Sequence, residues 1–255
     1  MKIVRFLHPK QGVPSWGYLK EKNTVLEINS PFSSQIEEKG GTFSLPDLKL
    51  LSPTAPSKVV AVGLNYRDHV AEFQHQIPEN PIIFLKPSTA VIGPDEPILL
   101  PPSSQKVDYE GELAVVIKKP AKNVSTSQAD SYILGYTCLN DVTARDLQKK
   151  DGQWTRAKSF DTFSPIGPWI ETDLEPGQLE LRSLVNGQIK QNASTSNLIF
   201  PVKELIAFIS QVMTLLPGDI IATGTPAGVG PLKPGDTVEI SIQGIGTLRN
   251  PVKKA

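Results

Sequence analysis

Short apolar runs separated by turns fill the first 50 residues of the chain. Apolar side chains alternate or cluster, as in β-strands, at residues 3–6, 16–19 and 24–26. Gly40-Gly41 breaks this segment, and the Pro- and Ser-rich stretch 51–58 has the composition of a linker. The pattern predicts a small β domain at residues 1–50, a linker at 51–58 and a second domain at 59–255.

The second domain contains one segment that alternates strictly, residues 107–117. One face of this predicted strand carries Val107, Tyr109, Gly111 and Leu113, and the other carries Asp108, Glu110 and Glu112. Further apolar runs predict strands at residues 59–63, 81–85 and 132–139. A helix-like run covers residues 142–149, and apolar residues recur at helical spacing from 202 to 216. With turn-punctuated strands from 219 to 252, the pattern favours a β-rich α+β fold.

Composition excludes several classes of function. The 26 Lys and Arg balance 26 Asp and Glu, so the chain lacks the basic excess that binds nucleic acid. Cys138 is the single cysteine and can form neither an internal disulfide nor a zinc cluster. The first residues lack the pattern of a signal peptide, and charges interrupt the most apolar stretch, residues 198–222. We therefore expect a cytoplasmic protein without a membrane partner.

Glu110 and Glu112 are the strongest chemical signal, because two carboxylates two residues apart on a strand point the same way. They could lie on a solvated face. However, their face continues into Ala114 and Val116, which indicates an interior strand, and clustered interior carboxylates need a cation. An all-oxygen site suits Mg²⁺, Mn²⁺ or Ca²⁺ rather than zinc. Asp141 is equally good as a third ligand and as a helix N-cap.

His69 and Glu72 stand three residues apart and could touch on a helix, which would give a general base oriented by a carboxylate. A surface contact without a function is the alternative. Lys86 and Lys158 follow or adjoin apolar segments and could balance the charge of a substrate, or be solvated. The glycine-rich stretch 223–230 could offer N–H groups to an anion, although it is neither a phosphate loop nor a dinucleotide fingerprint.

Nine short motifs stand in order over most of residues 58–252, and in them the sequence closely resembles the fumarylacetoacetate hydrolase family. The motifs are Val62-Gly-Leu-Asn-Tyr-Arg-Asp-His69, Phe84-Leu-Lys-Pro87, Asp108-Tyr-Glu-Gly-Glu-Leu113, Asn140-Asp-Val-Thr-Ala-Arg-Asp146, Lys158-Ser-Phe-Asp-Thr-Phe163, Gly167-Pro168, Asn186-Gly187, Pro217-Gly-Asp219 and Thr223-Gly-Thr-Pro226. Each motif alone is weak, but nine in order are specific.

The resemblance implies a mixed β-sandwich or roll preceded by a small β domain, usually as a homodimer. It implies that Glu110, Glu112 and Asp141 hold Mg²⁺ or Mn²⁺. It also implies a water-activating pair, His69 and Glu72, on a helix that often acts as a mobile lid. The remaining residues that it places at the substrate or around the metal are Arg145, Gln148, Lys158, Gly224 and Thr225, with Lys158 taking part in catalysis.

The implied substrate is a small 2-oxo acid. We expect first a metal-dependent hydrolase that cleaves a C–C bond in a 2,4-dioxo acid to give pyruvate and a carboxylic acid. Alternatives are an oxaloacetate decarboxylase or tautomerase, and then an isomerase or decarboxylase of unsaturated dioxo-diacids; a non-enzymatic binding protein comes last. The wall around the far end of the substrate is expected from residues 67–78 and 152–155.

Overall fold

The structure, a computed structural model, describes residues 1–72 and 76–255. The strands are β1 (Lys2–Leu7), β2 (Pro14–Glu21), β3 (Thr24–Ile28), β4 (Glu38–Ser44), β5 (Lys58–Gly63), β6 (Ile82–Pro87), β7 (Val91–Ile92), β8 (Ile98–Leu100), β9 (Val107–Tyr109), β10 (Gly111–Ile117), β11 (Ile133–Asn140), β12 (Thr143–Ala144), β13 (Ser164–Glu171), β14 (Glu180–Val185), β15 (Gln188–Ser194), β16 (Ile220–Ala222), β17 (Gly230–Pro231), β18 (Thr237–Ile242) and β19 (Gly246–Lys254). The α-helices are α1 (Arg67–Glu72), α2 (Arg145–Asp151), α3 (Thr155–Lys158) and α4 (Val202–Val212). The predicted β-rich α+β class is confirmed.

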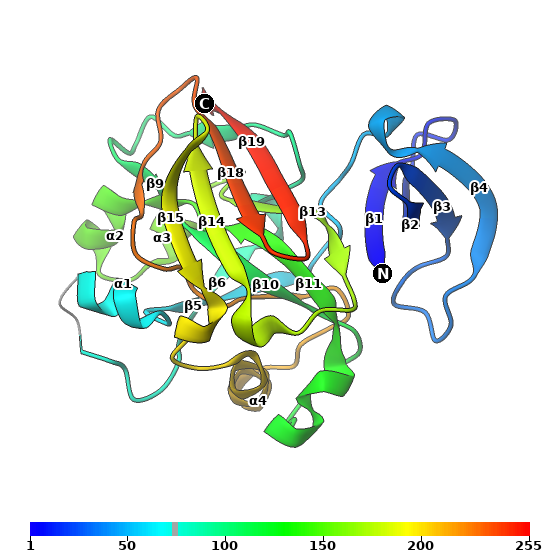
Figure 1. The fold of residues 1–255 in the computed structure, drawn as a ribbon. Coiled ribbons are helices and arrows are strands. Elements are labelled where there is room, and N and C mark those ends of the chain that lie inside the picture. The colour runs from blue at the N-terminus through cyan, green and yellow to red at the C-terminus, as the bar shows by residue number, and fades with distance from the viewer. Residues whose placement is uncertain (73–75) are drawn as a thin grey trace.

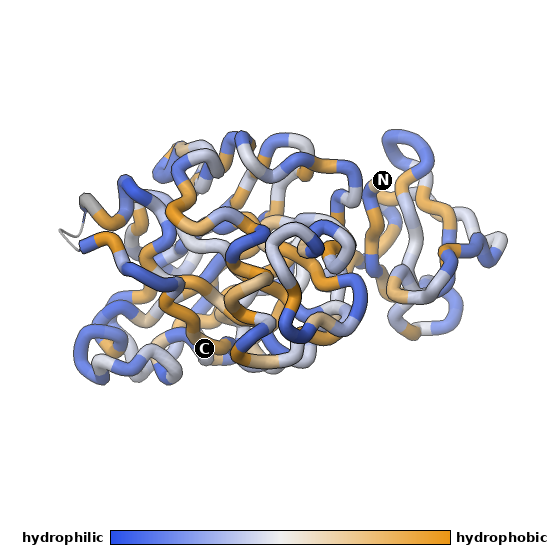
Figure 2. The backbone as a smooth tube through the Cα atoms, turned by 90° about the horizontal axis from the view of Figure 1, so that it is seen from below, coloured by the Kyte–Doolittle hydropathy of each residue, from blue (hydrophilic) through white to orange (hydrophobic). Residues whose placement is uncertain are grey.

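Two sheets pack against each other in the larger body of the molecule (Figure 1). One follows the order β4-β3-β2-β1-β13-β11-β10-β16-β5-β6 and the other β15-β14-β18-β19-β8. Leu113 and Val115 of β10 share one apolar core with Leu181 of β14 and Ile240 of β18. Figure 2 shows the apolar stretches gathered in the middle of this body. The arrangement is a β-sandwich.

Strand β10 is buried on both faces. Leu113 and Val115 face the core between the sheets, whereas Ala114 and Val116 belong to a second core with Ile220 of β16. Every residue of β10 is buried. Glu112 lies on β10 and Glu110 directly precedes it, and both are buried, which confirms that the segment carrying the paired carboxylates lies in the interior.

Strands β1–β4 form a lobe beside the larger body (Figure 1). The lobe continues the large sheet, because β1 pairs with β13 through Lys2↔Glu171 and Ile3↔Ile170. We expected Gly40-Gly41 to break this strand segment, but the two glycines lie inside β4. The register between β3 and β4 shifts there, and Gly40 takes φ +83°, so the glycines form a bulge within the strand.

The segment predicted as one strand at residues 107–117 is two strands, because the ladder breaks at Glu110. The side chain of Asn140 accepts from the Glu110 amide at 2.9 Å. β9 then turns into a small sheet of order β12-β9-β17. The side chain of Asn140 thus replaces a backbone partner at the point where the chain passes from the small sheet, through β9, into the large sheet, through β10.

Both helix predictions need correction. The helix expected at residues 142–149 begins only at Arg145, since Thr143 and Ala144 pair with β9 as strand β12. The helix expected at residues 202–216 ends at Val212, and Leu215 forms a bridge with Ala121. Within the described ranges, no helix has the length and apolar character needed to cross a membrane.

Candidate metal centre and active site

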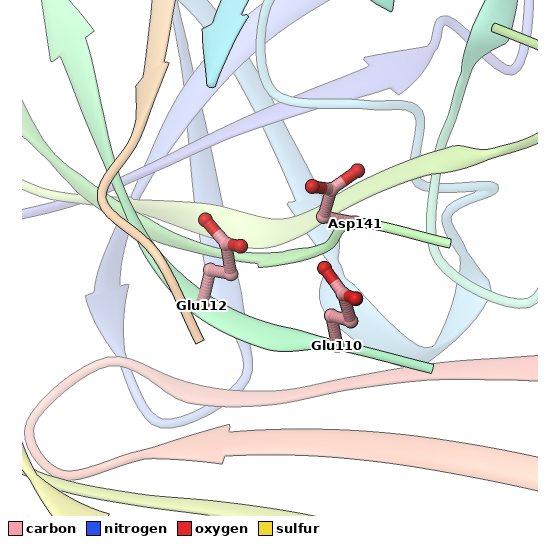
Figure 3. Close-up of side chains that lie close together, drawn as sticks. All are labelled: Glu110, Glu112 and Asp141. Atoms are coloured by element: carbon pink, nitrogen blue, oxygen red, sulfur yellow. The ribbon is translucent and has the colours of Figure 1, made fainter. Parts of the chain in front are cut away.

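Three carboxylates meet where β10 and β11 pair. Glu110 precedes β10, Glu112 lies on it and Asp141 follows β11 (Figure 3). The antiparallel pair Gly111↔Asn140 brings them together, because Glu110 and Glu112 flank Gly111 and Asp141 directly follows Asn140. Ligand atoms of the three side chains all lie within 4.8 Å of one another. Each residue is at most 5 % exposed, so the triad is an interior acidic site.

The triad fits a divalent cation. Its donors are all carboxylate oxygens, which Mg²⁺ and Mn²⁺ prefer. Glu112 accepts from the Gly224 amide at 2.8 Å, yet burial, together with the carboxylates of Asp141 and Glu110, raises the pKa of Glu112 well above its ordinary value. A bound cation would relieve this repulsion. Asp141 is not the N-cap of α2, because Ala144 has that position.

Two buried lysines hold the carboxylate of Asp141. Lys158 Nζ lies 2.7 Å from Asp141 Oδ2 and 2.7 Å from Glu110 Oε2. Lys86 Nζ donates to Asp141 Oδ1 and, at 3.2 Å, to the carbonyl of Val142. Burial alone would lower the pKa of Lys158, but the carboxylates of Asp141 and Glu110 raise it above its ordinary value. Lys158 is therefore held as a cation beside the triad.

Arg145 supplies a third cation. Its Nε donates to Asp108 Oδ2 at 2.9 Å, its Nη2 to Glu110 Oε1, and its Nη1 to Gln148 Oε1 at 2.6 Å. Burial would raise the pKa of Glu110, but Lys158 and Arg145 hold it below its ordinary value. The guanidinium is thus engaged by protein groups and orients Glu110.

His69 and Glu72 make the contact that their spacing predicts. His69 Nδ1 lies 3.3 Å from Glu72 Oε2, and both residues are on α1. Burial lowers the pKa of His69, although the carboxylates of Glu110 and Glu72 oppose the shift. The imidazole is therefore favoured in the neutral form, which can accept a proton. The amide of Gly228 also donates to Glu72, at 3.3 Å to Oε1 and 3.4 Å to Oε2.

A cavity of about 300 Å³ joins these groups. The residues that line it are Val62, Gly63, Leu64, His69, Phe84, Glu110, Glu112, Asp141, Arg145, Gln148, Lys149, Gly152, Trp154, Lys158 and Thr225. A pocket of this size with a few convergent polar groups is typical of a small-molecule site. The chain thus combines an acidic triad that could hold a cation, a buried base and positively charged side chains in one cavity.

Most of the residues implied by the resemblance lie at the cavity, with exceptions. Glu72 and Gly224 are not among its described lining residues. Each contacts a residue that does line the cavity. Glu72 contacts His69, and the Gly224 amide donates to Glu112. Of the expected far wall, His69, Gly152 and Trp154 are among the lining residues, and residues 73–75 of the segment 67–78 lie outside the described residues.

Two residues that build the site, Asn140 and Gln191, were not predicted from the sequence. Asn140 breaks the ladder at Glu110 and stands within a quoted motif, so the motif could have indicated it. Gln191 accepts from the Gly111 amide at 3.0 Å and donates to Thr225 Oγ1 at 2.9 Å. The sequence around Gln191 carries no signal for this role.

A buried acidic triad that could hold a cation, on a two-sheet β-rich scaffold, is typical of metal-dependent enzymes, and the comparison with known proteins identifies the family. The model of the fumarylacetoacetate hydrolase C-terminal domain matches residues 58–253, so the chain belongs to the fumarylacetoacetate hydrolase family. The model of an Rv2993c-like N-terminal domain matches residues 1–53.

Named relatives differ in activity. The crystal structure of 2-hydroxyhepta-2,4-diene-1,7-dioate isomerase from Mycobacterium marinum is 50 % identical, with a TM-score of 0.92 over 100 % of this chain and 98 % of that one. The mitochondrial oxaloacetate tautomerase Fahd2a of Rattus norvegicus is 45 % identical over 78 % of this chain and 67 % of its own length. Maleylpyruvate hydrolase from Sphingobium sp. SYK-6, solved with Mn²⁺ and pyruvate, is 30 % identical, with a TM-score of 0.82 over both whole chains. The family therefore includes isomerases, tautomerases and hydrolases.

Proposed function

We propose that the chain is a divalent-metal-dependent hydrolase that cleaves a C–C bond in a 2,4-dioxo acid, giving pyruvate and a carboxylic acid. The observation that carries the proposal is the His69–Glu72 pair, whose imidazole lines the same cavity as the carboxylate triad. A hydrolase needs such a base to activate water.

The triad would hold Mg²⁺ or Mn²⁺, which when bound supplies Lewis-acid stabilisation to the carboxylate and adjacent carbonyl of a 2-oxo acid. His69 takes a proton from a water molecule, and Glu72 orients the ring and stabilises the imidazolium that forms. The water oxygen bonds to the distal carbonyl carbon. The bond between that carbon and the methylene then breaks, and its electron pair passes into the pyruvate enolate.

Lys158 offsets the charge of the enolate, since its ammonium lies beside Glu110 and Asp141 within the cavity. His69 then returns its proton to the enolate carbon, which gives pyruvate, and the other product leaves as a carboxylic acid. Atoms and charge balance, with one water consumed.

We also propose that the protein is a homodimer, and light scattering of the purified protein tests this oligomeric state.

Oxaloacetate tautomerisation is the second candidate, favoured by the 45 % identity to the rat oxaloacetate tautomerase. In that reaction His69 would exchange the C3 proton of oxaloacetate instead of a water proton. Decarboxylation of oxaloacetate would release the same enolate, and isomerisation of an unsaturated dioxo-diacid also needs proton exchange next to a 2-oxo acid.

A paired absorbance assay separates these candidates. Acetylpyruvate and oxaloacetate are followed separately with Mg²⁺, again after EDTA, and with the His69→Ala variant. Loss of acetylpyruvate that needs both the metal and His69, with pyruvate and acetate as products, is the expected result. Turnover of oxaloacetate alone would overturn the hydrolase proposal in favour of the second candidate.

A further inference from the structure

Part of the cavity wall is apolar and begins next to the triad. Its apolar lining consists of Val62, Gly63, Leu64, Phe84 and Trp154. Lys158 Nζ, which contacts the triad, lies 5.1 Å from the centroid of the Phe84 ring. The Phe84 ring in turn lies 5.2 Å from the Trp154 ring, edge to face at 78°. These contacts lead in three steps from the carboxylates through Lys158 and Phe84 to Trp154, and all of these residues line the cavity.

We call these five residues the apolar strip. The backbone at residues 63–65 supports the packing of this strip. A Cβ on Gly63 would lie 2.5 Å from Cζ3 and 2.7 Å from Cη2 of Trp154, so the indole packs directly on the Gly63 backbone. Leu64 takes φ +55°, a left-handed conformation that strains a residue with a bulky side chain. The side chain of Asn65 fixes this turn by donating to the Thr223 carbonyl at 2.7 Å and accepting from the Phe200 amide at 2.7 Å.

The charges around the triad match a ligand with one carboxylate. Within the described ranges, the connected buried cluster holds four carboxylates, those of the triad and Asp108, against the three cations Lys86, Arg145 and Lys158. In their ordinary ionised forms these groups leave one negative charge. A divalent cation would reverse the sign, and one 2-oxo carboxylate would then bring the cluster to neutrality.

Where the far end of such a ligand lies along the strip, a second carboxylate there would meet the rings of Phe84 and Trp154. Burying a charge against an apolar surface is costly unless a cation pairs with it. Among the described lining residues, the cation left for this purpose is Lys149, whose side chain is exposed. The strip therefore suits an apolar group better than a charged one.

We propose that the apolar strip is a distal subsite that selects 2-oxo acids with an apolar, above all aromatic, far end over dicarboxylates. Trp154 is the specificity-determining residue, and Gly63 positions it. The inference rests on the proposed function, because the 2-oxo acid head must lie at the triad for its far end to reach the strip.

The test uses three ligands that share a carboxylate and an adjacent carbonyl, but carry an amide nitrogen in place of the methylene and lack the distal carbonyl that water would attack. They are oxamate, N-phenyloxamate and N-oxalylglycine, and each is titrated calorimetrically into the whole protein with Mg²⁺. We expect N-phenyloxamate to bind about tenfold more tightly than the dicarboxylate N-oxalylglycine, as an aromatic contact in a buried site provides.

Variants separate the strip from the rest of the site. Trp154→Ala is expected to raise the Kd of N-phenyloxamate about tenfold and to leave the Kd of oxamate within about twofold of its wild-type value. Trp154→Phe keeps a ring and is expected to retain most of the preference. Gly63→Ala, which pushes on the indole, is expected to reduce the preference with Trp154 still present. Thermal unfolding of each variant confirms that it is folded.

The outcomes distinguish the inference from the function on which it rests. Binding of N-oxalylglycine as tight as that of N-phenyloxamate would overturn the subsite and leave the proposed function standing. If Trp154→Ala loses affinity for oxamate and N-phenyloxamate equally, the subsite would also be overturned, since Trp154 would then only support the fold. Failure of all three ligands to bind with Mg²⁺ would overturn the proposed function itself.

Discussion

Lys86 donates to the carboxylate of Asp141 without being among the described residues that line the cavity. The lysine is fully buried and Asp141 is 1 % exposed. Burial lowers the pKa of Lys86, and the Asp141 carboxylate opposes that shift. Lys86 is therefore placed to hold a candidate metal ligand against β6 rather than to contact a substrate.

Replacing Lys86 should be among the most destabilising changes in the domain. Lys86→Met leaves Asp141 with one fewer partner, and breaking a buried ion pair costs about 3–5 kcal/mol. We expect the free energy of unfolding, measured with urea, to fall by about that amount. Lys203→Met is the control, because the Lys203–Asp130 pair is more than half exposed and should matter little. A Lys86→Met protein as stable as the wild type would contradict the interpretation.

The pH profile should report the environment of His69. A base works in its neutral form, so kcat/KM falls as the pH drops through the pKa of His69. Because burial lowers that pKa, we expect the acid limb to lie below about pH 6.5, the ordinary value for histidine. The same profile measured with Glu72→Gln should move further down, since the Glu72 carboxylate raises the pKa of His69. An acid limb above the ordinary value would show that another group limits the rate.

Stability without metal should depend on pH through Glu112. Its pKa is raised in the folded state, by burial first and then by Asp141 and Glu110. The stabilising effect of its protonated form is complete below the pKa of the unfolded chain and is lost as the pH rises through the folded pKa. We therefore expect the EDTA-treated protein to lose stability as the pH rises from about 4, the unfolded value.

Mg²⁺ should reverse that loss. At a concentration one hundred times its Kd, a ligand that binds only the folded state adds about 2.7 kcal/mol to the free energy of unfolding. Thermal unfolding at pH 8 with and without Mg²⁺ measures the gain, and Ca²⁺ or Mn²⁺ can replace Mg²⁺ in the same series. Glu112→Gln should remove both the pH dependence and most of the gain. If the variant responds to Mg²⁺ as the wild type does, Glu112 is not a ligand.

Local patterns predicted much of this architecture, because periodicity reports burial. The alternation around Glu110 and Glu112 indicated an interior strand, and the spacing of His69 and Glu72 indicated their contact. The hairpin β14–β15 was missed although its Asn186-Gly187 turn, with φ +52° and +76°, carries a recognised hairpin signal.

Non-local contacts could not be read in this way. The break at Glu110 depends on the side chain of Asn140, thirty residues away, and the packing of Trp154 on Gly63 joins segments ninety-one residues apart. No periodicity relates such positions. For Asp141, the residues alone left a third ligand and a helix N-cap equally good, and only the family resemblance favoured the ligand. Its approach to Glu110 and Glu112 depends on the register between β10 and β11.

Gln191 offers a last test of a residue that the sequence did not reveal. It is 1 % exposed, and its amide contacts the Gly111 amide, Ser183 Oγ at 2.6 Å and Thr225 Oγ1. Gln191→Ala leaves buried polar partners unsatisfied, each at a cost of about 1–3 kcal/mol, so we expect the free energy of unfolding to fall by about 3 kcal/mol. Gln188→Ala, on the same strand but exposed, is the matched control in urea denaturation. Because Gly111 lies between Glu110 and Glu112, Gln191→Ala should also weaken Mg²⁺ binding measured by calorimetry. A variant that loses stability but binds Mg²⁺ normally would limit Gln191 to packing.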